Sequence, residues 1–137
     1  MGGTSGERAI SLSTGKACIS ALKKKKYLVS KFDPKFKNLN LINKNKIDVI
    51  FNALHGRDGE DGVAQSYFEY LKIPYTHSGV ISSFNCMNKI HSKELFIKNK
   101  IKTPKFSLIT KYNFQKSLIQ KILNKKNFKF PMVLKPV

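Results

Sequence analysis

The sequence has few features that would form disulfides, span a membrane or direct the chain to a compartment. Its 137 residues include two cysteines, Cys18 and Cys86, and no tryptophan. Two thiols without a secretory signal favour a reducing compartment, and they lack the spacing of a zinc site. No apolar run approaches the roughly 18 residues of a membrane span, and the lysine run at 23–26 is too internal for a signal peptide. These absences favour a cytoplasmic setting and one domain, or one domain plus part of another.

Acidic residues and arginines are also scarce. Eight acids stand against 26 basic residues, which gives a net charge of +18, and only two of the basic residues are arginines. Such a charge permits nucleic-acid binding, because lysines neutralise phosphates and release counterions. However, the lysines are spread over every segment, and arginine is the usual residue for forked phosphate contacts. A basic nucleic-acid-binding protein therefore stays an alternative only. Arg8 and Arg57 both lie in glycine-containing loops, which indicates a role that lysine cannot fill.

Alternating hydrophobic patterns predict an α/β fold in the first part of the chain. Ser11 or Ser13 is expected to cap a helix that ends near residue 25. The patterns then predict a strand at 27–32, a strand at 48–54, a helix at about 62–71, an extended piece at 73–76 and a brief helix that ends near 86. The apolar run 48–54 is typical of a strand buried on both faces of a parallel sheet. Residues 35–46 are weakly patterned and indicate a connection.

The same alternation continues to the end of the chain. Thr103-Pro104 interrupts it, and no internal repeat is visible. The patterns predict a helix at 87–99, a strand at 106–109, a lysine-rich helix at about 112–125 and a last strand at 130–135. The chain as a whole is therefore predicted to be α/β.

The loop that follows the apolar run 48–54 is dense in polar residues that can carry chemistry. It holds three glycines, a histidine, an arginine and three acids. In open α/β sheets, ligands bind at the carboxyl ends of the strands. His55, at the point where strand becomes loop, could orient a carboxylate or move a proton. Asp58, Glu60 and Asp61 could ligate magnesium, but their place before a helix favours pairing with Arg57 and capping.

A second glycine-rich loop opens the chain. Its free backbone N–H groups could bind an anion, and Glu7 offers a carboxylate for a substrate ammonium. The alternative is a solvated turn with a capping acid. Lys89, Lys93 and Lys135 could each contact a nucleotide phosphate, although a single lysine in so basic a chain is more often a surface charge. Lys135 is the best candidate on local grounds, because it ends an apolar strand and precedes a proline.

Five segments, taken in order, resemble the D-alanine–D-alanine ligase family of ATP-grasp enzymes. They are Met1–Arg8 with Ser11-Leu12, Ala53–Gly62, Ile73–Thr76 with Ser78–Val80, Met87–Lys89 with Ser92-Lys93, and Phe130–Pro136. The loop Leu-His-Gly-Arg-Asp-Gly-Glu-Asp-Gly is the most specific of them. The resemblance implies a Rossmann-like (pre-ATP-grasp) parallel sheet domain over 1–86 that lacks its first strand. Residues 87–137 would then be the truncated beginning of the central ATP-grasp domain.

The resemblance also implies a reaction and the residues that serve it. ATP would phosphorylate the carboxylate of one D-alanine, and the amine of a second would attack the acylphosphate, for peptidoglycan precursor synthesis. Glu7 matches the glutamate that holds the ammonium of the first D-alanine, and His55 matches the histidine beside its carboxylate. Both would therefore bind substrate and serve catalysis. Lys89 and Lys135 match two lysines that contact ATP phosphates. The implied cofactors are ATP and Mg²⁺, with metal ligands beyond Val137 and none within the chain; the family suggests a homodimer.

Three positions depart from the family pattern, and so do both ends. Ala9 stands in place of a frequent glutamate, Asn88 in place of an aspartate, and His77 in place of a glycine, where it could crowd the substrate side. Only Met1 remains of the expected first strand, and the phosphate-covering loop would follow Pro136. Residues 1–137 alone are therefore expected to show no D-alanine-dependent phosphate release.

Two further alternatives stay open. A sister ligase that makes D-Ala–D-lactate or D-Ala–D-serine would share these segments, because residues beyond Val137 largely govern the second substrate. A non-catalytic remnant that folds poorly without its first strand is the other.

Overall fold

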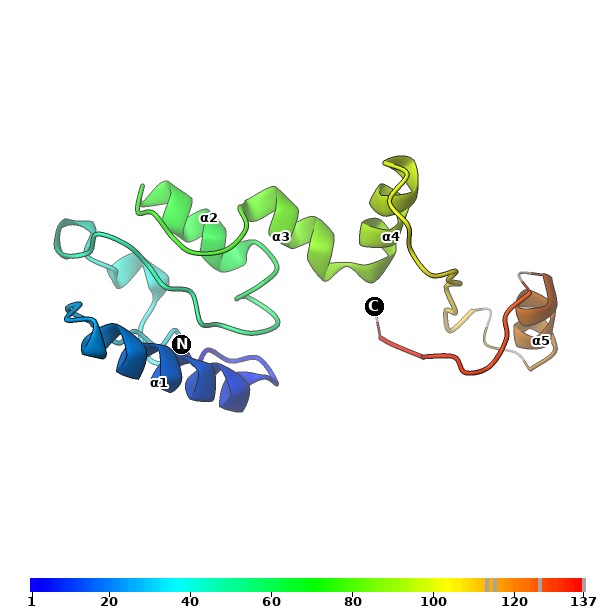
Figure 1. Ribbon diagram of the computed structural model, residues 1–137, viewed down its shortest axis with the longest axis horizontal. Helices are drawn as coiled ribbons and strands as arrows, with labels where there is room; N and C mark the ends of the chain where they lie inside the picture. Colours follow the sequence, from blue (N-terminus) through cyan, green and yellow to red (C-terminus); the bar gives the residue numbers. More distant parts are fainter. Residues whose placement is uncertain (113, 115, 126, 137) are drawn as a thin grey trace. The chain divides into compact units, whose positions relative to one another are not determined.

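The computed structural model describes residues 1–112, 114, 116–125 and 127–136. The chain forms two compact units, Met1–Met87 and Asn88–Val137, which are traced in Figure 1. The first unit holds α1 (Arg8–Lys24), two 3₁₀ turns, η1 (Leu39–Leu41) and η2 (Lys44–Lys46), then α2 (Val63–Tyr70) and α3 (Val80–Met87). The second unit holds α4 (Lys89–Lys98) and α5 (Lys116–Lys125). Each predicted helix is present within a few residues of its expected bounds.

Helix α1 begins earlier than its serines predict. Glu7 is its N-cap residue and makes no side-chain capping hydrogen bond, so neither Ser11 nor Ser13 caps the helix. Ser11 is instead fully buried. Its hydroxyl accepts a hydrogen bond from Gly2 N at 2.7 Å and donates one to Ala53 O. Ser11 therefore fastens the N-terminal loop to the apolar run 48–54. Because Glu7 makes no capping hydrogen bond, its carboxylate stays available for other partners.

The core of the first unit is small. It centres on four buried side chains, Ile42, Ala64, Phe68 and Ile73, two of which come from α2. Partly buried apolar side chains pack around them: Phe32, Leu39, Ile47, Ile50, Leu54, Leu71 and Tyr75. The weakly patterned segment 35–46 thus supplies Ile42 and Leu39 to the core, which its lysine-rich sequence conceals.

The predicted strand 48–54 pairs with the extended piece 73–76 through a single bridge. Ile50 N donates to Pro74 O at 2.8 Å, and Thr76 N donates to Ile50 O at 3.0 Å. The next amide, Asn52 N, donates to the Thr76 hydroxyl at 3.0 Å instead of to a backbone carbonyl. His77 then turns the backbone away with a φ of 82°. The pairing is parallel as predicted, but the threonine side chain and this turn end it.

The other predicted strands are not paired in the described part of the chain. Residues 27–32, 106–109 and 130–135 carry no strand there, and Leu28 is 103% exposed. The prediction that 48–54 is buried on both faces is also wrong, because Val49 is 59% and Phe51 is 43% exposed. An extended segment becomes a strand only when its backbone N–H and C=O groups form hydrogen bonds with those of a neighbouring segment. Apolar sequence therefore predicts an extended segment but cannot supply the partner that makes it a strand.

Gly62 fixes the entry into α2 and yields a direct prediction. Its φ is 96°, and a Cβ at this position would lie 2.9 Å from Val80 O. Left-handed backbone costs a residue with a Cβ about 1–2 kcal/mol. Gly62→Ala should therefore lower the free energy of unfolding by at least that amount, measured by urea denaturation. Gly6→Ala is the matched control, since nothing lies within 4 Å of its added Cβ. Equal losses in the two variants would contradict this interpretation.

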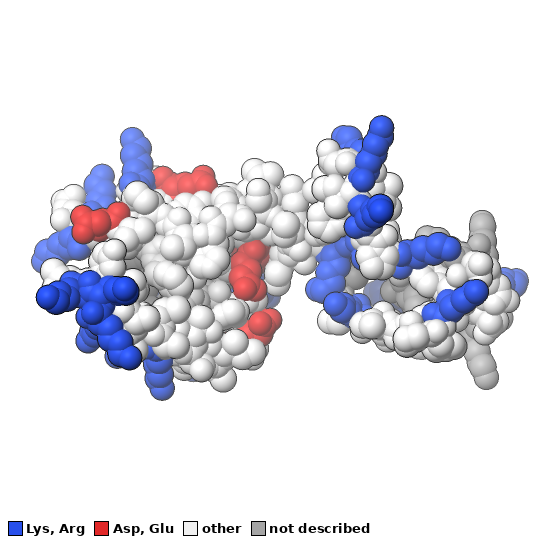
Figure 2. Space-filling model, viewed as in Figure 1, with Lys and Arg blue, Asp and Glu red and all other residues white. Residues whose placement is uncertain are grey.

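The described residues contain no helix long and apolar enough to cross a membrane. Lysine and arginine side chains are spread over both units in Figure 2 and do not gather in one patch on that face. Glu94 is the only acidic residue in 88–137. The spread of basic side chains in Figure 2 matches the even spread of lysine along the sequence.

Candidate functional site

The two glycine-rich loops meet in the first unit. Glu7 ends the N-terminal loop, and His55 and Glu60 belong to the loop after 48–54. One ligand atom from each of these three side chains lies within 4.8 Å of the other two. We call this group the Glu7–His55–Glu60 cluster. The hydroxyl of Ser5 donates to His55 O at 2.7 Å and joins the two loops directly.

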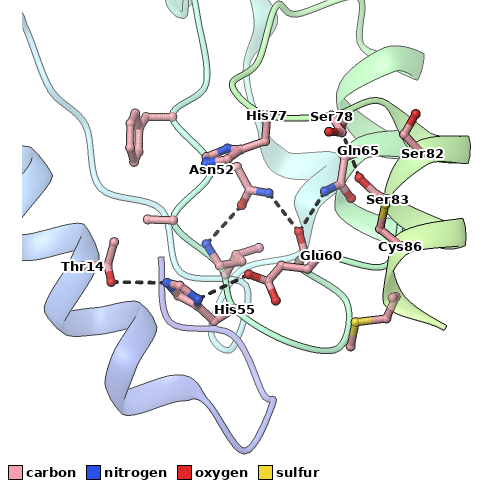
Figure 3. Close-up of a pocket in the computed structure, with 15 residues that line it drawn as sticks. Thr14, Asn52, His55, Glu60, Gln65, His77, Ser78, Ser82, Ser83 and Cys86 are labelled. Atoms are coloured by element: carbon pink, nitrogen blue, oxygen red, sulfur yellow. Dashed lines mark hydrogen bonds and ion pairs between the residues drawn. The ribbon is translucent and has the colours of Figure 1, made fainter. Parts of the chain in front are cut away.

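The His55 ring is held from both sides, as Figure 3 shows. Its Nε2 lies 3.2 Å from the Thr14 hydroxyl on α1, and its Nδ1 lies 3.3 Å from Glu60 Oε1. Its side chain is 28% exposed, so it keeps access to solvent. Both ring nitrogens thus have a partner, and the two contacts fix the orientation of the ring. The sequence predicts the importance of His55, but it gives no sign of Thr14.

Glu60 holds the loop and does not cap α2. Its Oε2 accepts a hydrogen bond from Gly56 N at 2.8 Å, and its Oε1 faces His55. A Cβ on Gly56 would lie 3.1 Å from Glu7 Oε1, so the Glu7 carboxylate lies close against the Gly56 backbone. Glu60 therefore has a structural role in the loop, but not the expected pairing with Arg57 or capping of α2, and it also belongs to the cluster. Asp61 behaves as predicted, since it accepts from the backbone N–H groups of Asp58 and Val63.

Two buried side-chain amides, those of Asn52 and Gln65, form hydrogen bonds to the loop after 48–54. Asn52 Nδ2 and Gln65 Nε2 both donate to Gly59 O at 2.9 Å. These contacts hold the Gly59 turn against α2. Gln65 is 2% exposed, and its Oε1 has no hydrogen-bond partner among the described residues. Sequence alone does not reveal either amide, because nothing in the pattern distinguishes them from surface polar residues.

The cluster borders a cavity of about 390 Å³ within the first unit, which Figure 3 shows. His55 and Glu60 line one part of it, and the helix α3 side is lined by Ser82, Ser83 and Cys86. His77, the residue expected to crowd the substrate side, is also in the lining. Its Nδ1 lies 2.8 Å from the Thr76 hydroxyl. The cavity can hold a small polar molecule beside the Glu60 carboxylate and the His55 imidazole, and Glu7 is not among its lining residues.

Arg8 and Arg57 have different roles. Arg8 donates to both oxygens of Asp33, with Nη2 at 2.8 Å from Oδ2, and also donates to Gly3 O. This two-pronged contact is one that lysine cannot make, and it anchors the N-terminal loop. The Arg57 side chain is 86% exposed and lies 3.8 Å from Asp58. The predicted pairing of Arg57 with a loop acid is therefore present, but at the surface.

The Asp33 anchor predicts how stability depends on pH. The hydrogen bonds from Arg8, followed in effect by those from the backbone of Gly3 and Lys35, hold the pKa of the Asp33 carboxyl well below its usual range. A carboxyl with a lowered pKa in the folded state contributes stability above its unfolded pKa of about 3.9 and loses it as pH falls below that value. Because the folded-state pKa lies well below about 3.9, much of this stability persists at about pH 3 and is lost only at lower pH. Asp33→Asn should therefore destabilise the chain at pH 7 and much less near pH 2, in chemical denaturation at about these two pH values.

Asp48→Asn is the matched control for this experiment. Asp48 is exposed, so its replacement should leave the pH dependence unchanged. If Asp33→Asn destabilises the chain equally at both pH values, the anchor does not act through its charge.

The two lysines predicted to contact ATP lie in the second unit. Lys89 is the first residue of α4, is exposed, and follows the N-cap residue Asn88, whose side chain accepts from Ile90 N and His91 N. Lys135 is exposed in the extended segment that ends the described chain. Lys93 has local partners instead, because its ammonium donates to the Thr103 hydroxyl at 3.0 Å and to Pro104 O at 3.1 Å. The structure therefore brings Glu7 and His55 together, whereas Lys89 and Lys135 belong to the other unit.

Comparison with known proteins defines the class of the chain. Residues 30–78 match the family described as D-ala D-ala ligase N-terminus, and residues 86–137 match the RimK-like ATP-grasp domain. The D-alanine–D-alanine ligase of Pelagibacter ubique is 53% identical over 99% of this chain, and D-alanine–D-alanine ligase B of Mesorhizobium japonicum is 41% identical over 100%. The chain spans 44% and 42% of those two relatives.

Solved structures agree with the sequence comparison. The crystal structure of D-alanine–D-alanine ligase from Bacillus anthracis matches with a TM-score of 0.71 and 36% identity, over 90% of this chain and 41% of that one. The same enzyme complexed with ATP matches with a TM-score of 0.70. An ATP-grasp protein is thus the class that these matches define. The chain is a homologue of the D-alanine–D-alanine ligases.

Proposed function

We propose that the protein containing this chain is an ATP-dependent, cytoplasmic ligase that joins two D-alanines through an acylphosphate for peptidoglycan precursors. The observation that carries the proposal is the convergence of Glu7 and His55 in one cluster. These are the two residues that the family resemblance assigns to the first D-alanine, and they come from loops far apart in sequence. The 53% identity to a D-alanine–D-alanine ligase supports the same assignment.

Each member of the cluster has a physical reason for its role. The Glu7 carboxylate is not consumed by helix capping, so it can pair with the ammonium of a D-alanine. His55 contacts Thr14 through one ring nitrogen and Glu60 through the other, and it would present an imidazole N–H to the substrate carboxylate by exchanging one of these partners. Together they would hold the two charged ends of one amino acid. Fixing both ends places the carboxylate for attack on a phosphate, and positioning of this kind lowers the barrier of a two-substrate reaction.

The second unit would serve ATP. ATP supplies the phosphoryl group that activates the substrate carboxylate. Lys89 and Lys135 are exposed ammonium groups that can neutralise its phosphates, which is the main task of a protein in phosphoryl transfer. The described residues do not fit Mg²⁺. Their one group of three neighbouring ligand side chains includes an imidazole, whereas Mg²⁺ prefers an octahedron of oxygens.

The proposal extends to the organisation of the chain. Residues 1–86 would form the substrate-side domain with a parallel sheet, and 87–137 the beginning of the ATP-grasp domain. The single parallel bridge between Ile50 and Tyr75 supports such a sheet. The exposed side chains of Leu28, Val49 and Phe51 are those that further strands would cover. A homodimer of the whole protein is part of the same proposal.

A chimera tests the function. The corresponding 44% of the Pelagibacter ubique ligase is replaced by these 137 residues, and D-alanine-dependent phosphate release is measured. We expect turnover within about tenfold of the parent enzyme. Product analysis with D-lactate and D-serine as second substrates checks the sister activities. A chimera that unfolds cooperatively but shows no turnover would contradict the proposal.

A salt titration of the 137-residue chain distinguishes the proposed ligase from the alternative of a nucleic-acid-binding protein. Any polycation binds DNA at low salt and releases it as salt rises. Only a preference for one sequence or structure at physiological salt would favour dedicated nucleic-acid binding. We expect no such preference.

A further inference from the structure

We propose that the Glu7–His55–Glu60 cluster is a binding site for a divalent transition-metal ion of the Zn²⁺ type, and that this ion competes with an amino-acid ammonium. The metal site stands on the geometry of the cluster alone. Only the competition rests on the proposed function.

The spacing of two donors already suits such an ion. His55 Nδ1 and Glu60 Oε1 are 3.3 Å apart. A tetrahedral ion with bonds of about 2.0–2.1 Å separates its ligands by about 3.3–3.4 Å. Glu7 completes the group, with a ligand atom within 4.8 Å of both others. Glu7 is exposed, so its side chain can close the remaining distance by rotating about its own bonds.

The hydrogen bonds around the cluster orient the donor atoms toward one another. When His55 Nε2 donates to the Thr14 hydroxyl, the lone pair of Nδ1 faces the Glu60 carboxylate. In this tautomer the two lone pairs face one another across 3.3 Å, and a metal ion between them would replace the proton that Nδ1 donates to Glu60 in the other tautomer. A hydrogen-bond partner on the far ring nitrogen is the usual arrangement for a metal-binding histidine.

A hydrogen bond also orients the Glu60 carboxylate. Gly56 N occupies its Oε2, which leaves Oε1 directed at the ring. The hydroxyl of Ser5 holds the His55 carbonyl, and this keeps the two loops in register. The site is therefore partly assembled before any ion arrives, and an assembled site loses less conformational freedom on binding.

The chemistry of the donors selects the ion. One imidazole and two carboxylates suit Zn²⁺, Co²⁺ or Ni²⁺, whereas Mg²⁺ and Ca²⁺ favour oxygen ligands alone. The cluster also provides only three protein ligands. A three-ligand zinc site keeps a position open to water or to another small molecule.

The consequence for substrate follows from charge. The Glu7 carboxylate that would hold an ammonium is the same group that would ligate the metal. One carboxylate cannot serve both cations fully, so Zn²⁺ and a D-amino acid should weaken each other's binding. Mg²⁺ should not have this effect at comparable concentration.

The test is a titration of the chain with Zn²⁺ alone, in which isothermal calorimetry measures the binding. We expect one ion per chain. We also expect His55→Ala and Glu60→Gln each to weaken binding by about tenfold or more, as loss of a ligand or its orienting partner does. Co²⁺ titration should give a visible absorption spectrum that His55→Ala removes. Circular dichroism checks that each variant stays folded.

The matched controls replace the other histidines and cysteines of the sequence, in the variants His77→Ala, His91→Ala, Cys18→Ser and Cys86→Ser. Unchanged binding in all four supports the cluster. The proposal is overturned if no Zn²⁺ binds, if binding survives His55→Ala, or if a control variant loses it. Zinc binding that persists at saturating D-alanine overturns the competition. None of these results bears on turnover by the chimera, which tests the proposed function separately.

Discussion

Glu7→Gln in the chimera should raise the KM for D-alanine by about ten- to hundredfold. A hydrogen bond between charged groups contributes about 1.5–3 kcal/mol, and each 1.4 kcal/mol is a factor of ten in affinity. Glutamine keeps the size and one oxygen of the side chain but removes the charge that pairs with the ammonium. The KM for ATP should stay unchanged, because Glu7 belongs to the unit that would bind the amino acid.

Steady-state kinetics with both substrates check this expectation. Glu94→Gln makes the same change at an exposed acid of α4 and should leave both constants as they are. If Glu7→Gln alters only kcat, or raises both KM values together, Glu7 does not hold the substrate ammonium.

Lys135→Met should raise the KM for ATP by about tenfold or more in the same chimera. The change removes one ammonium from a phosphate contact and keeps most of the length of the side chain. Charge neutralisation of the transferring phosphate is the main protein contribution in this class of reaction, so kcat should fall as well. Lys89→Met should act in the same direction.

Lys129→Met and Lys98→Met are the matched controls, since both residues are exposed and lie on the same segments. A chain with this many lysines demands such controls, because loss of general charge could mimic loss of a specific contact. Equal effects of Lys129→Met and Lys135→Met would show that only general charge is involved.

Helices were the part of the fold most open to prediction. The apolar spacing within 63–70 depends only on neighbouring residues, and α2 lies within the predicted bounds. The sheet was less predictable, since its pairing depends on residues far away in the chain. The Thr76 hydroxyl takes the amide of Asn52, and the left-handed His77 turns the chain aside. Neither event has a sequence signature that would have given the register.

The candidate site divides in the same way. His55 and Glu7 could be singled out from their loops and the family resemblance, and the structure brings them together. Thr14 and Gln65 could not, because a hydroxyl on a helix and a buried amide gain meaning only from what they touch. Glu60 shows the limit most clearly. Its capping position predicted a structural acid, but folding also directs its second oxygen at the His55 ring.

The most direct test of the central claim is a D-alanine titration of the 137-residue chain, followed through backbone amide chemical shifts. The account predicts saturable shifts at Glu7, His55 and Gly56 that D-alanine produces and L-alanine does not, and that Glu7→Gln removes. Identical responses to the two enantiomers, or shifts confined to residues outside the two glycine-rich loops, would contradict it.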